Sequence, residues 1–212
     1  MKDPWPYVVA LPIAYIVGSM SFGLLIGRLR RGVDVRRYGS GSSGTTNVLR
    51  TMGVRAALLV MALDGAKGAI AVLVARWLDG GPLVESLAAT LAVTGHIWPV
   101  FTKFEGGRGV ITGFIALLVI SPIAGGFALI GLLIAGITRY VSVGSMAGTT
   151  LGVGSLFVLI IIGWVDIAYL IFGSIGYVSI MARHRGNIVR LARGSENRLS
   201  RPSRPKRKRD ER

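Results

Sequence analysis

Long apolar runs separated by short polar segments organise this chain. The first run covers residues 7–27, and it is followed by runs at 56–75, 83–101, 110–138, 146–163 and 167–181. Most of these runs approach the length of about 20 apolar residues that a helix needs to cross the hydrocarbon core of a bilayer. The pattern therefore predicts an all-α integral membrane protein whose polar segments connect the helices.

The composition is typical of a membrane protein and excludes several kinds of functional site. Hydrophobic residues make up 51% of the 212 residues, and the mean hydropathy is +0.58. The chain has no cysteine, which excludes disulfides, thiolate metal sites and cysteine nucleophiles. The run 7–27 is too long for the core of a signal peptide, and it has neither a basic region before it nor a small-residue cleavage site after it. We therefore expect a spanning helix there.

Basic residues gather in alternate connecting segments. The segment 28–55 holds seven arginines, the segment 102–109 holds one lysine and one arginine, and the segment 183–212 holds twelve basic residues. The turns at 79–82 and 164–166 hold none. Because cytoplasmic loops carry an excess of lysine and arginine, we expect both polar loops and the chain end in the cytoplasm, and the N-terminus outside.

This orientation fixes the expected number of helices. If the run 110–138 crossed once, the basic chain end would lie outside, so the run has to cross twice, with breaks available at Ser121–Pro122 and at Gly125–Gly126. Each half would then be about 13–15 residues, or roughly 20–22 Å, against a hydrocarbon core of about 30 Å. The sequence predicts a bundle of seven transmembrane helices that includes two short ones.

The polar segment 33–50, VDVRRYGSGSSGTTNVLR, is a candidate phosphate site. A loop of small residues at the start of a helix exposes free backbone N–H groups, which bind phosphate well when arginine is near. The glycines allow a tight loop and close approach of a ligand, and they stand at Gly39, Gly41 and Gly44. Hydroxyls are supplied by Ser40, Ser42, Ser43, Thr45 and Thr46. The alternative interpretation is a flexible basic linker.

Three polar segments are expected at one face of the membrane. They are GSGSSGTTNVLR, KFEGGRG and RHRGNIVRLARGSENR. Each combines backbone or hydroxyl donors with cationic groups, and the planar guanidinium of arginine binds phosphate through two hydrogen bonds. Arg50, Arg108 and the arginines of 183–198 therefore suit a site for doubly charged groups, although any one segment alone could be a solvated loop.

The same stretches resemble a known enzyme family. GSMSFGLLIGR…DVRRYGSGSSGTTNVLR, GHIWPVFTKFEGGRGV and RHRGNIVRLARGSENR are similar to the three motifs of the bacterial acyl-phosphate:glycerol-3-phosphate acyltransferases (the PlsY family), in order from Gly18 to Arg198. The resemblance implies an enzyme of the bacterial inner membrane that transfers a fatty acyl chain from acyl phosphate to the 1-hydroxyl of glycerol 3-phosphate. The products would be lysophosphatidic acid and phosphate, at the first step of phospholipid synthesis. The family's seven helices and cytoplasmic motifs agree with the count reached from charge.

The resemblance also implies roles for individual residues. The expected catalytic residues are Ser40, Arg50, His184 and Asn187. The expected substrate-binding residues are Gly39, Gly41, Thr46, Asn47, Lys103, Gly106, Gly107, Arg108, Gly109, Glu196 and, before the sixth helix, Ser142 or Ser145. The chain departs from the family at two positions, with Ser42 where asparagine is usual and Arg108 where lysine is usual. Ser42 keeps a donor with shorter reach, and Arg108 keeps the charge with another geometry.

Four further side chains need an interpretation. His184 could act as a general base, or it could hydrogen-bond a phosphate while a substrate phosphate oxygen takes the proton; we favour the second slightly. No Ser-His-Asp set is apparent, and we interpret His96 as structural. Asp64 and Lys67 lie three residues apart and hence on one helix face, where they could neutralise each other. An ion pair inside a membrane is a functional candidate, but we interpret it as a packing contact that fixes this helix against the loop.

The sequence implies few partners besides the two substrates and membrane lipids. Residues 1–198 form the predicted transmembrane acyltransferase domain, and 199–212 form a basic tail that we expect to be disordered, cytoplasmic and attracted to anionic headgroups. The tail lacks the aromatic residues that would support nucleic-acid binding. We expect no metal, no cofactor and a monomer.

Two other functions fit less well. LDGAKG at 63–68 faintly resembles the aspartate-rich motif of CDP-alcohol phosphotransferases, but that chemistry needs further acids one or two turns along the helix to hold divalent metals. An anion transporter or channel would need polar residues through the middle of several helices, and beyond Asp64 and Lys67 there are few.

Overall fold

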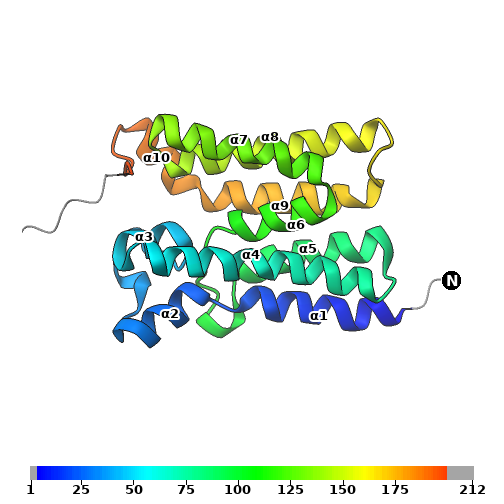
Figure 1. Cartoon of the computed structure of the whole chain (residues 1–212), viewed down its shortest axis with the longest axis horizontal. Helices are drawn as coiled ribbons and strands as arrows, with labels where there is room; N and C mark the ends of the chain where they lie inside the picture. The colour runs from blue at the N-terminus through cyan, green and yellow to red at the C-terminus, as the bar shows by residue number, and fades with distance from the viewer. Residues whose placement is uncertain (1–3, 200–212) are drawn as a thin grey trace, which may run out of the picture.

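The protein is a helical bundle, described here by a computed structural model for residues 4–199. No strand occurs in this range, and the long helices run side by side (Figure 1). The α-helices are α1 (Trp5–Ser19), α2 (Phe22–Arg31), α3 (Thr45–Met52), α4 (Val54–Trp77), α5 (Gly81–Ile97), α6 (Val110–Ile120), α7 (Pro122–Thr138), α8 (Val141–Ile161), α9 (Leu170–Arg183) and α10 (Arg185–Ala192). Short 3₁₀ turns are η1 (Val35–Arg37), η2 (Val100–Thr102) and η3 (Ile167–Tyr169).

Three to five segments have the length and composition of membrane spans. The segments that qualify alone are α4 with 24 residues, Gly81–Thr102 with 22 and α8 with 21. Two further pairs qualify if each bent pair is counted as one span. They are α1 with α2, bent by 41°, and Ile167–Arg183 with α10, bent by 50°. The remaining apolar helices, α6 and α7, have 11 and 17 residues. All-helical membrane architecture is thus present, while the seven crossings and their direction stay predictions.

Two apolar runs divide where polar groups interrupt the helix. The run 7–27, expected as one helix, ends its first part at Ser19 and resumes at Phe22. The run 110–138 divides at Ser121, whose Oγ accepts a hydrogen bond from the backbone N–H of Ala124 over 3.3 Å and so caps α7. Pro122 then occupies the first position of α7, where a missing N–H costs no hydrogen bond. The other expected break, Gly125–Gly126, lies inside α7.

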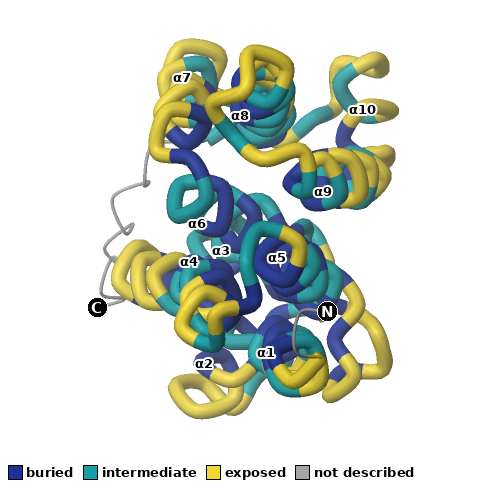
Figure 2. Tube along the Cα trace, turned by 90° about the vertical axis from the view of Figure 1, so that its right-hand side faces the viewer, coloured by how far each residue is buried: buried dark blue, intermediate teal, exposed yellow. Residues whose placement is uncertain are grey.

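The helices form two groups joined by α6 and α9. Seen end-on, the α7–α8 pair lies on one side and α1, α4 and α5 lie on the other (Figure 2). Glycines bring α7 and α8 together, since a Cβ on Gly131 would meet the Gly144 carbonyl and, at 2.6 Å, Cα of Gly148. Small residues are the usual means by which membrane helices approach closely.

A buried carboxylate fastens the bundle at the end where the chain begins. Glu85 on α5 is 6% exposed, and Arg76 on α4 binds both of its oxygens, at 3.2 and 2.7 Å. The hydroxyl of Tyr169 donates to the same carboxylate over 2.9 Å. Glu85 lies inside the apolar run 83–101 and was not among the residues expected to have a role. Its contacts join α4, α5 and η3, which makes it a structural anchor far from the polar loops.

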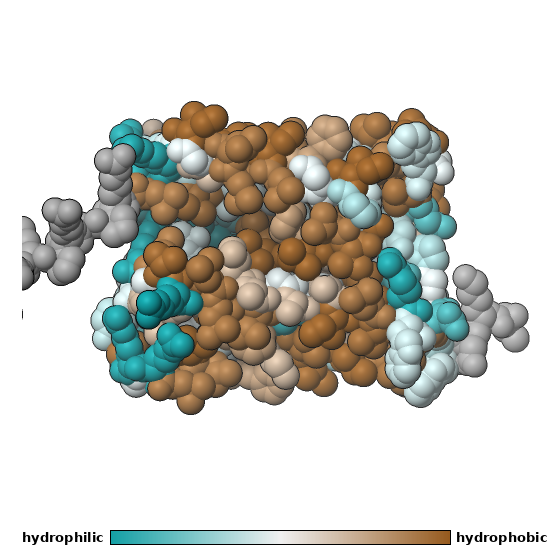
Figure 3. Space-filling view, in the orientation of Figure 1, coloured by the Kyte–Doolittle hydropathy of each residue, from teal (hydrophilic) through white to brown (hydrophobic). Residues whose placement is uncertain are grey.

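The first and third polar segments lie toward the opposite end, and contacts from Arg36 and Arg183 join the second segment to them. In Figure 1, α2, α3 and α10 lie at the left, and the turns after α4 and α8 lie at the right with the start of α1. Apolar side chains cover the middle of the molecule and polar ones lie toward both ends (Figure 3). The described residues include most of the predicted domain 1–198, whose limits stay a prediction. Apart from Leu199, the predicted basic tail 199–212 lies outside the described residues.

Candidate active site

A cavity of about 600 Å³ joins the polar end of the bundle to its apolar interior. Its polar wall comes from all three motif segments and includes Ser40, Arg50, Arg108, His184, Asn187 and Glu196. Its apolar wall comes from α6, α7, α8 and α9 and includes Phe114, Leu117, Leu129, Leu132, Val153 and Phe172. A single space thus has cations at one end and hydrocarbon along the rest.

The first polar loop is shaped by Asn47, which is fully buried at the start of α3. Its Oδ1 accepts a hydrogen bond from the backbone N–H of Ser40, and its Nδ2 donates to the carbonyls of Val35 and Ser42, each over 2.8 Å. Gly39 has φ +61°, and a Cβ there would collide with Asn47 Oδ1. Asn47 therefore folds the loop so that Ser40 lies on the cavity wall, while Asn47 itself does not.

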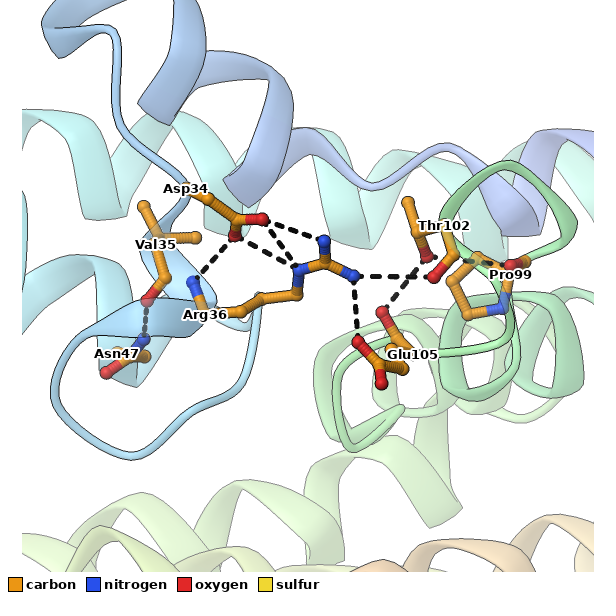
Figure 4. A network of polar contacts seen from close by, with 7 residues as sticks. All are labelled: Asp34, Val35, Arg36, Asn47, Pro99, Thr102 and Glu105. Carbon is orange, nitrogen blue, oxygen red and sulfur yellow. Dashed lines mark hydrogen bonds and ion pairs between the residues drawn. The ribbon is translucent and has the colours of Figure 1, made fainter.

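Arg36 ties the first polar loop to the second (Figure 4). Its Nη2 pairs with Asp34 Oδ2 at 2.8 Å, and its Nη1 donates to the carbonyl of Thr102 over 3.3 Å and to Glu105 Oε2 over 3.2 Å. The hydrogen bond from the Arg36 side chain lowers the pKa of Asp34 to about 2. One guanidinium thus fixes the distance between the loops from the side away from the cavity.

The glycine loop 106–109 is held from two sides. The N–H of Gly107 donates to the carbonyl of His96 over 3.1 Å. From the other side, Arg183 donates to the carbonyls of Gly107 and Gly106, at 3.3 and 3.4 Å. These contacts occupy backbone groups of Gly106 and Gly107. Because neither residue has a side chain, His96 and Arg183 can approach the loop closely.

Arg108 is the side chain that this loop directs at the cavity. It is only partly exposed and lies near Glu196 and the arginines at positions 50, 183 and 190. Burial lowers the pKa of the Arg108 guanidinium, the charge of Glu196 opposes that shift, and the neighbouring arginines add to it. Such a cluster of cations is stabilised when an anion enters it. Lys103, by contrast, is exposed and does not line the cavity.

Glu196 organises the third motif. Its Oε1 accepts hydrogen bonds from Asn187 Nδ2 at 2.6 Å and from Ser142 Oγ at 2.8 Å, and its Oε2 accepts one from Arg190 Nε at 2.8 Å. Burial alone would raise the pKa of Glu196, but these hydrogen bonds lower it below its ordinary value. The ionised carboxylate therefore binds α10 to the start of α8. Of the two candidate serines, Ser142 makes this contact, while Ser145 lies further along the cavity wall.

His184 presents one unpartnered nitrogen at the cavity wall. The side chain is completely buried, and Nδ1 lies 2.8 Å from the carbonyl of Ile180, one turn earlier in α9. A carbonyl only accepts, so Nδ1 carries the proton and Nε2 is a free acceptor. Nε2 is buried without a hydrogen-bond partner in the described chain. Burial lowers the pKa of His184 to about 4, so the imidazole is neutral at pH 7.

The expected site residues fall into two groups by position. Those on the cavity wall are Ser40, Thr46, Arg50, Arg108, Gly109, Ser142, Ser145, His184, Asn187 and Glu196. Those off the wall are Gly39, Gly41, Asn47, Lys103, Gly106 and Gly107. Asp64 and His96 also line the cavity, although sequence analysis gave neither a site role. Asp64 forms the expected ion pair with Lys67, with Oδ1 and Nζ 2.8 Å apart.

Comparisons with known proteins agree on one family. The model of the family described as "Glycerol-3-phosphate acyltransferase" matches residues 8–194. A glycerol-3-phosphate acyltransferase 3 of Dehalococcoides mccartyi is 42% identical over 207 residues, covering 91% of this chain and 95% of the relative. A glycerol-3-phosphate acyltransferase of Anaeromyxobacter sp. (strain Fw109-5) is 42% identical over 210 residues, covering 94% and 99%.

Solved structures give the same result. The crystal structure of PlsY (YgiH), an integral membrane glycerol 3-phosphate acyltransferase, in its glycerol 3-phosphate form has a TM-score of 0.83 and 37% sequence identity to this chain, covering 91% of this chain and 95% of that one. Its lysophosphatidic acid form has a TM-score of 0.80 at the same identity and coverage. At this level of identity the likeness extends from the fold to the enzyme class.

Proposed function

This chain belongs to the glycerol-3-phosphate acyltransferase family, and from that premise we propose that it transfers a fatty acyl chain from acyl phosphate to the 1-hydroxyl of glycerol 3-phosphate. It is an integral membrane acyltransferase of phospholipid synthesis. Lysophosphatidic acid and inorganic phosphate are the proposed products. The donor and the position of the acylated hydroxyl are the parts that need testing.

The continuity of the cavity carries this proposal. A fatty acyl phosphate has a long apolar chain and a doubly charged head, and the cavity offers an apolar wall from α6 to α9 that ends at Arg50 and Arg108. Glycerol 3-phosphate is small and anionic, and it would share the cationic end. Guanidinium groups suit both phosphates because they bind phosphate oxygens through charge-assisted hydrogen bonds.

The reaction itself requires positioning more than activation. An acyl phosphate is a mixed anhydride, so the hydroxyl oxygen of glycerol 3-phosphate adds to the acyl carbonyl and the bond to the phosphate oxygen breaks. Holding both reactants in place and stabilising the developing negative charge supplies most of the rate enhancement in such reactions. Ser40, Arg50, Arg108 and Asn187 are the donors on the cavity wall that we assign to this task.

The proton of the attacking hydroxyl needs an acceptor. Nε2 of His184 is unprotonated and has no partner among residues 4–199, so it can accept a hydrogen bond from the hydroxyl and orient it. With a pKa of about 4, however, the imidazole holds a proton less well than a phosphate monoester, whose second pKa is about 6. The only N–H of the neutral ring is bound to the carbonyl of Ile180, so the hydrogen bond from His184 to a phosphate that the sequence led us to favour does not fit this arrangement. We therefore assign orientation of the hydroxyl to His184 and acceptance of its proton to a substrate phosphate oxygen.

The membrane arrangement follows from the basic residues. We place the protein in the bacterial cytoplasmic membrane as a monomer with seven crossings, with the cationic end of the cavity in the cytoplasm and the N-terminus outside. Reporter fusions at the chain end and in the turn 79–82 should lie on opposite sides of the membrane. Reporters on the same side would contradict this orientation.

A reconstitution assay tests the function directly. Purified protein in lipid nanodiscs is supplied with glycerol 3-phosphate and either an acyl phosphate or the matching acyl-CoA, and lysophosphatidic acid and phosphate are measured. We expect turnover with acyl phosphate, one phosphate released for each lipid formed, and acylation at the 1-position. Turnover with acyl-CoA alone would reject the proposed donor, whereas turnover with neither donor would reject the proposed function for this chain.

A further inference from the structure

A buried polar cluster lies directly behind the glycine loop, where α1 breaks from α2. Lys67 on α4 is 1% exposed, and its Nζ lies 2.8 Å from Asp64 Oδ1, 2.8 Å from the carbonyl of Met20 and 3.3 Å from that of Gly18. These carbonyls are left free because α1 ends at Ser19. The ammonium group of Lys67 therefore neutralises the Asp64 carboxylate and also donates hydrogen bonds to the carbonyls at the broken helix end.

The same ammonium contacts His96 on α5. The distance from Lys67 Nζ to His96 Nδ1 is 3.0 Å. An ammonium group only donates hydrogen bonds, so Nδ1 has to accept and the imidazole proton resides on Nε2. Thr112 Oγ1 also lies 3.3 Å from His96 Nδ1. Its hydroxyl donates to the carbonyl of Asp64 over 2.8 Å, so it does not donate to Nδ1. Lys67 thus fixes the tautomer of His96, as second-layer contacts fix the histidines of many enzyme sites.

The protonated nitrogen of His96 faces the loop that carries Arg108. A Cβ on Gly107 would collide with Nε2 more closely than with any other atom of the ring, so the ring points end-on at this residue. His96 lies on the cavity wall, and within residues 4–199 no acceptor binds its Nε2. A neutral N–H donor that is held in one orientation and lacks an acceptor is suited to bind an anion.

We propose that His96 is a further substrate-contacting residue, whose Nε2–H donates a hydrogen bond to the phosphate group bound beside the Gly106–Gly109 loop, and that Lys67 and Asp64 are positioning residues that hold it in this tautomer. This inference rests on the proposed function. The phosphate group belongs to glycerol 3-phosphate or to the acyl phosphate. Gly107 is required to be glycine because the imidazole occupies the place of its side chain.

Two isosteric variants separate this role from a structural one. His96→Gln keeps an N–H donor near the position of Nε2 and loses the acceptor for Lys67, whereas His96→Asn keeps an acceptor near the position of Nδ1 and loses the donor. We expect His96→Asn to raise KM for one of the two substrates by roughly ten- to a hundredfold, the loss typical of one hydrogen bond to a charged group. His96→Gln should raise it less than threefold.

The two KM values identify which phosphate is bound, since only the KM of that substrate should change. Equal KM values in His96→Asn and the wild type, or a larger defect in His96→Gln than in His96→Asn, would overturn the proposal. Thermal unfolding of both variants is measured in parallel. If the wild type itself does not turn over, the proposed function fails on that ground and the next measurement decides the role of His96 alone.

Nitrogen NMR provides that independent measurement, because the chain has only two histidines. In ¹⁵N-histidine-labelled protein we expect opposite tautomers, with the proton on Nε2 in His96 and on Nδ1 in His184; the His96→Gln variant assigns the signals. Inorganic phosphate, and separately glycerol 3-phosphate, should shift the Nε2 signal of His96 more than its Nδ1 signal. A proton on Nδ1 of His96, or an Nε2 signal unchanged by either anion at saturation, would overturn the proposal.

Discussion

Asn187 donates from Nδ2 to Oε1 of Glu196 over 2.6 Å, and this contact sets the geometry of the third motif. The carboxylate also accepts hydrogen bonds from Ser142 and Arg190, so all three donors converge on one partly buried ion. The Asn187 amide can contact a substrate in the same way in every turnover only if its orientation is fixed. The main function of Glu196 is therefore to position its neighbours.

Replacing Glu196 by glutamine should reduce kcat more than it changes either KM. The amide keeps the size of the side chain but loses the charge, so the hydrogen bonds from Asn187 and Arg190 weaken. Hydrogen bonds to charged groups contribute about 1.5–3 kcal/mol, which corresponds to a fall of roughly ten- to a hundredfold in turnover. Glu105→Gln is the matched control, because the Glu105 side chain is 75% exposed and, within the described residues, its carboxylate pairs with Arg36 alone. Equal effects of the two substitutions would remove Glu196 from the site.

Arg108 should tolerate lysine better than alanine. Its side chain lies among other cations at the polar end of the cavity, and we expect it to act there chiefly through its positive charge, which lysine also carries. Arg108→Ala should lower kcat/KM by on the order of a hundred- to a thousandfold, the cost of losing one preorganised donor, and Arg108→Lys by about tenfold. Kinetics with each substrate varied in turn measure both values. Equal damage from the two substitutions would mean that the forked geometry of arginine is essential.

Sequence patterns predicted the membrane class and the three converging segments because both depend on features that repeat along the chain. The apolar runs define the helices, and the glycines, hydroxyls and arginines mark the loops. The break between α1 and α2 could not be predicted, since it depends on Lys67, which lies more than forty residues away and binds the carbonyls of Gly18 and Met20. The resemblance to the family supplied the residue roles, and these stay predictions.

Long-range contacts also decide which of the expected site residues line the cavity and which lie behind it. Asn47 and Gly107 carry polar or small groups typical of a phosphate loop, but the structure uses them to fold the loops around Val35 and His96. Sequence spacing cannot show whether a polar group faces the ligand or the backbone behind it. His96 illustrates the converse case, because a lone histidine at a helix end gives no sequence signal of the ammonium group that orients it.

The ring of His184 should stay neutral until the pH approaches 4. Its pKa is about 4 in the folded protein, because the side chain is buried, and about 6.5 in the unfolded chain. Between these values the unfolded state binds more protons, so the contribution of His184 to stability decreases as the pH falls from about 6.5 to 4 and is constant below. The NMR titration of the His184 ring checks this midpoint. A midpoint near 6.5 would show that water reaches the ring, and would restore His184 as a candidate general base.

Catalysis should continue in an excess of chelator. Phosphotransfer from a nucleotide-linked alcohol needs divalent ions and a group of carboxylates to hold them. In the described part of the chain, no three His, Cys, Asp or Glu side chains are grouped so that they could hold a metal ion. The polar end of the cavity is instead lined by Arg50 and Arg108, whose guanidinium groups are suited to bind phosphate directly and would repel a cation. Loss of turnover on chelation, with recovery on adding magnesium, would contradict the arginine-based site and reopen the role of Asp64.

Two glycines of α7 should respond in opposite ways to alanine. A Cβ on Gly131 would meet the carbonyl of Gly144 and Cα of Gly148, and backbone atoms of a packed helix cannot turn aside. Gly131→Ala should therefore push α7 from α8, at a cost of about 1–3 kcal/mol for overpacking. Gly136 is exposed on the same helix with nothing within 4 Å of a new Cβ. Gly136→Ala should leave stability unchanged or raise it by about 0.5–1 kcal/mol, since alanine favours the helix.

Thermal inactivation in nanodiscs compares the two variants under one condition. The Gly131→Ala protein should also bind acyl phosphate less well, because Gly131, Gly144 and Gly148 line the cavity as well as the helix contact. Separation of α7 from α8 would change the width of the apolar wall while leaving Arg50 and Arg108 in place, so KM for acyl phosphate should rise and KM for glycerol 3-phosphate should not. A Gly131→Ala protein as stable and as active as Gly136→Ala would contradict this prediction. It would show that the α7–α8 contact can relax around a new methyl group and that binding of the acyl chain does not depend on this contact.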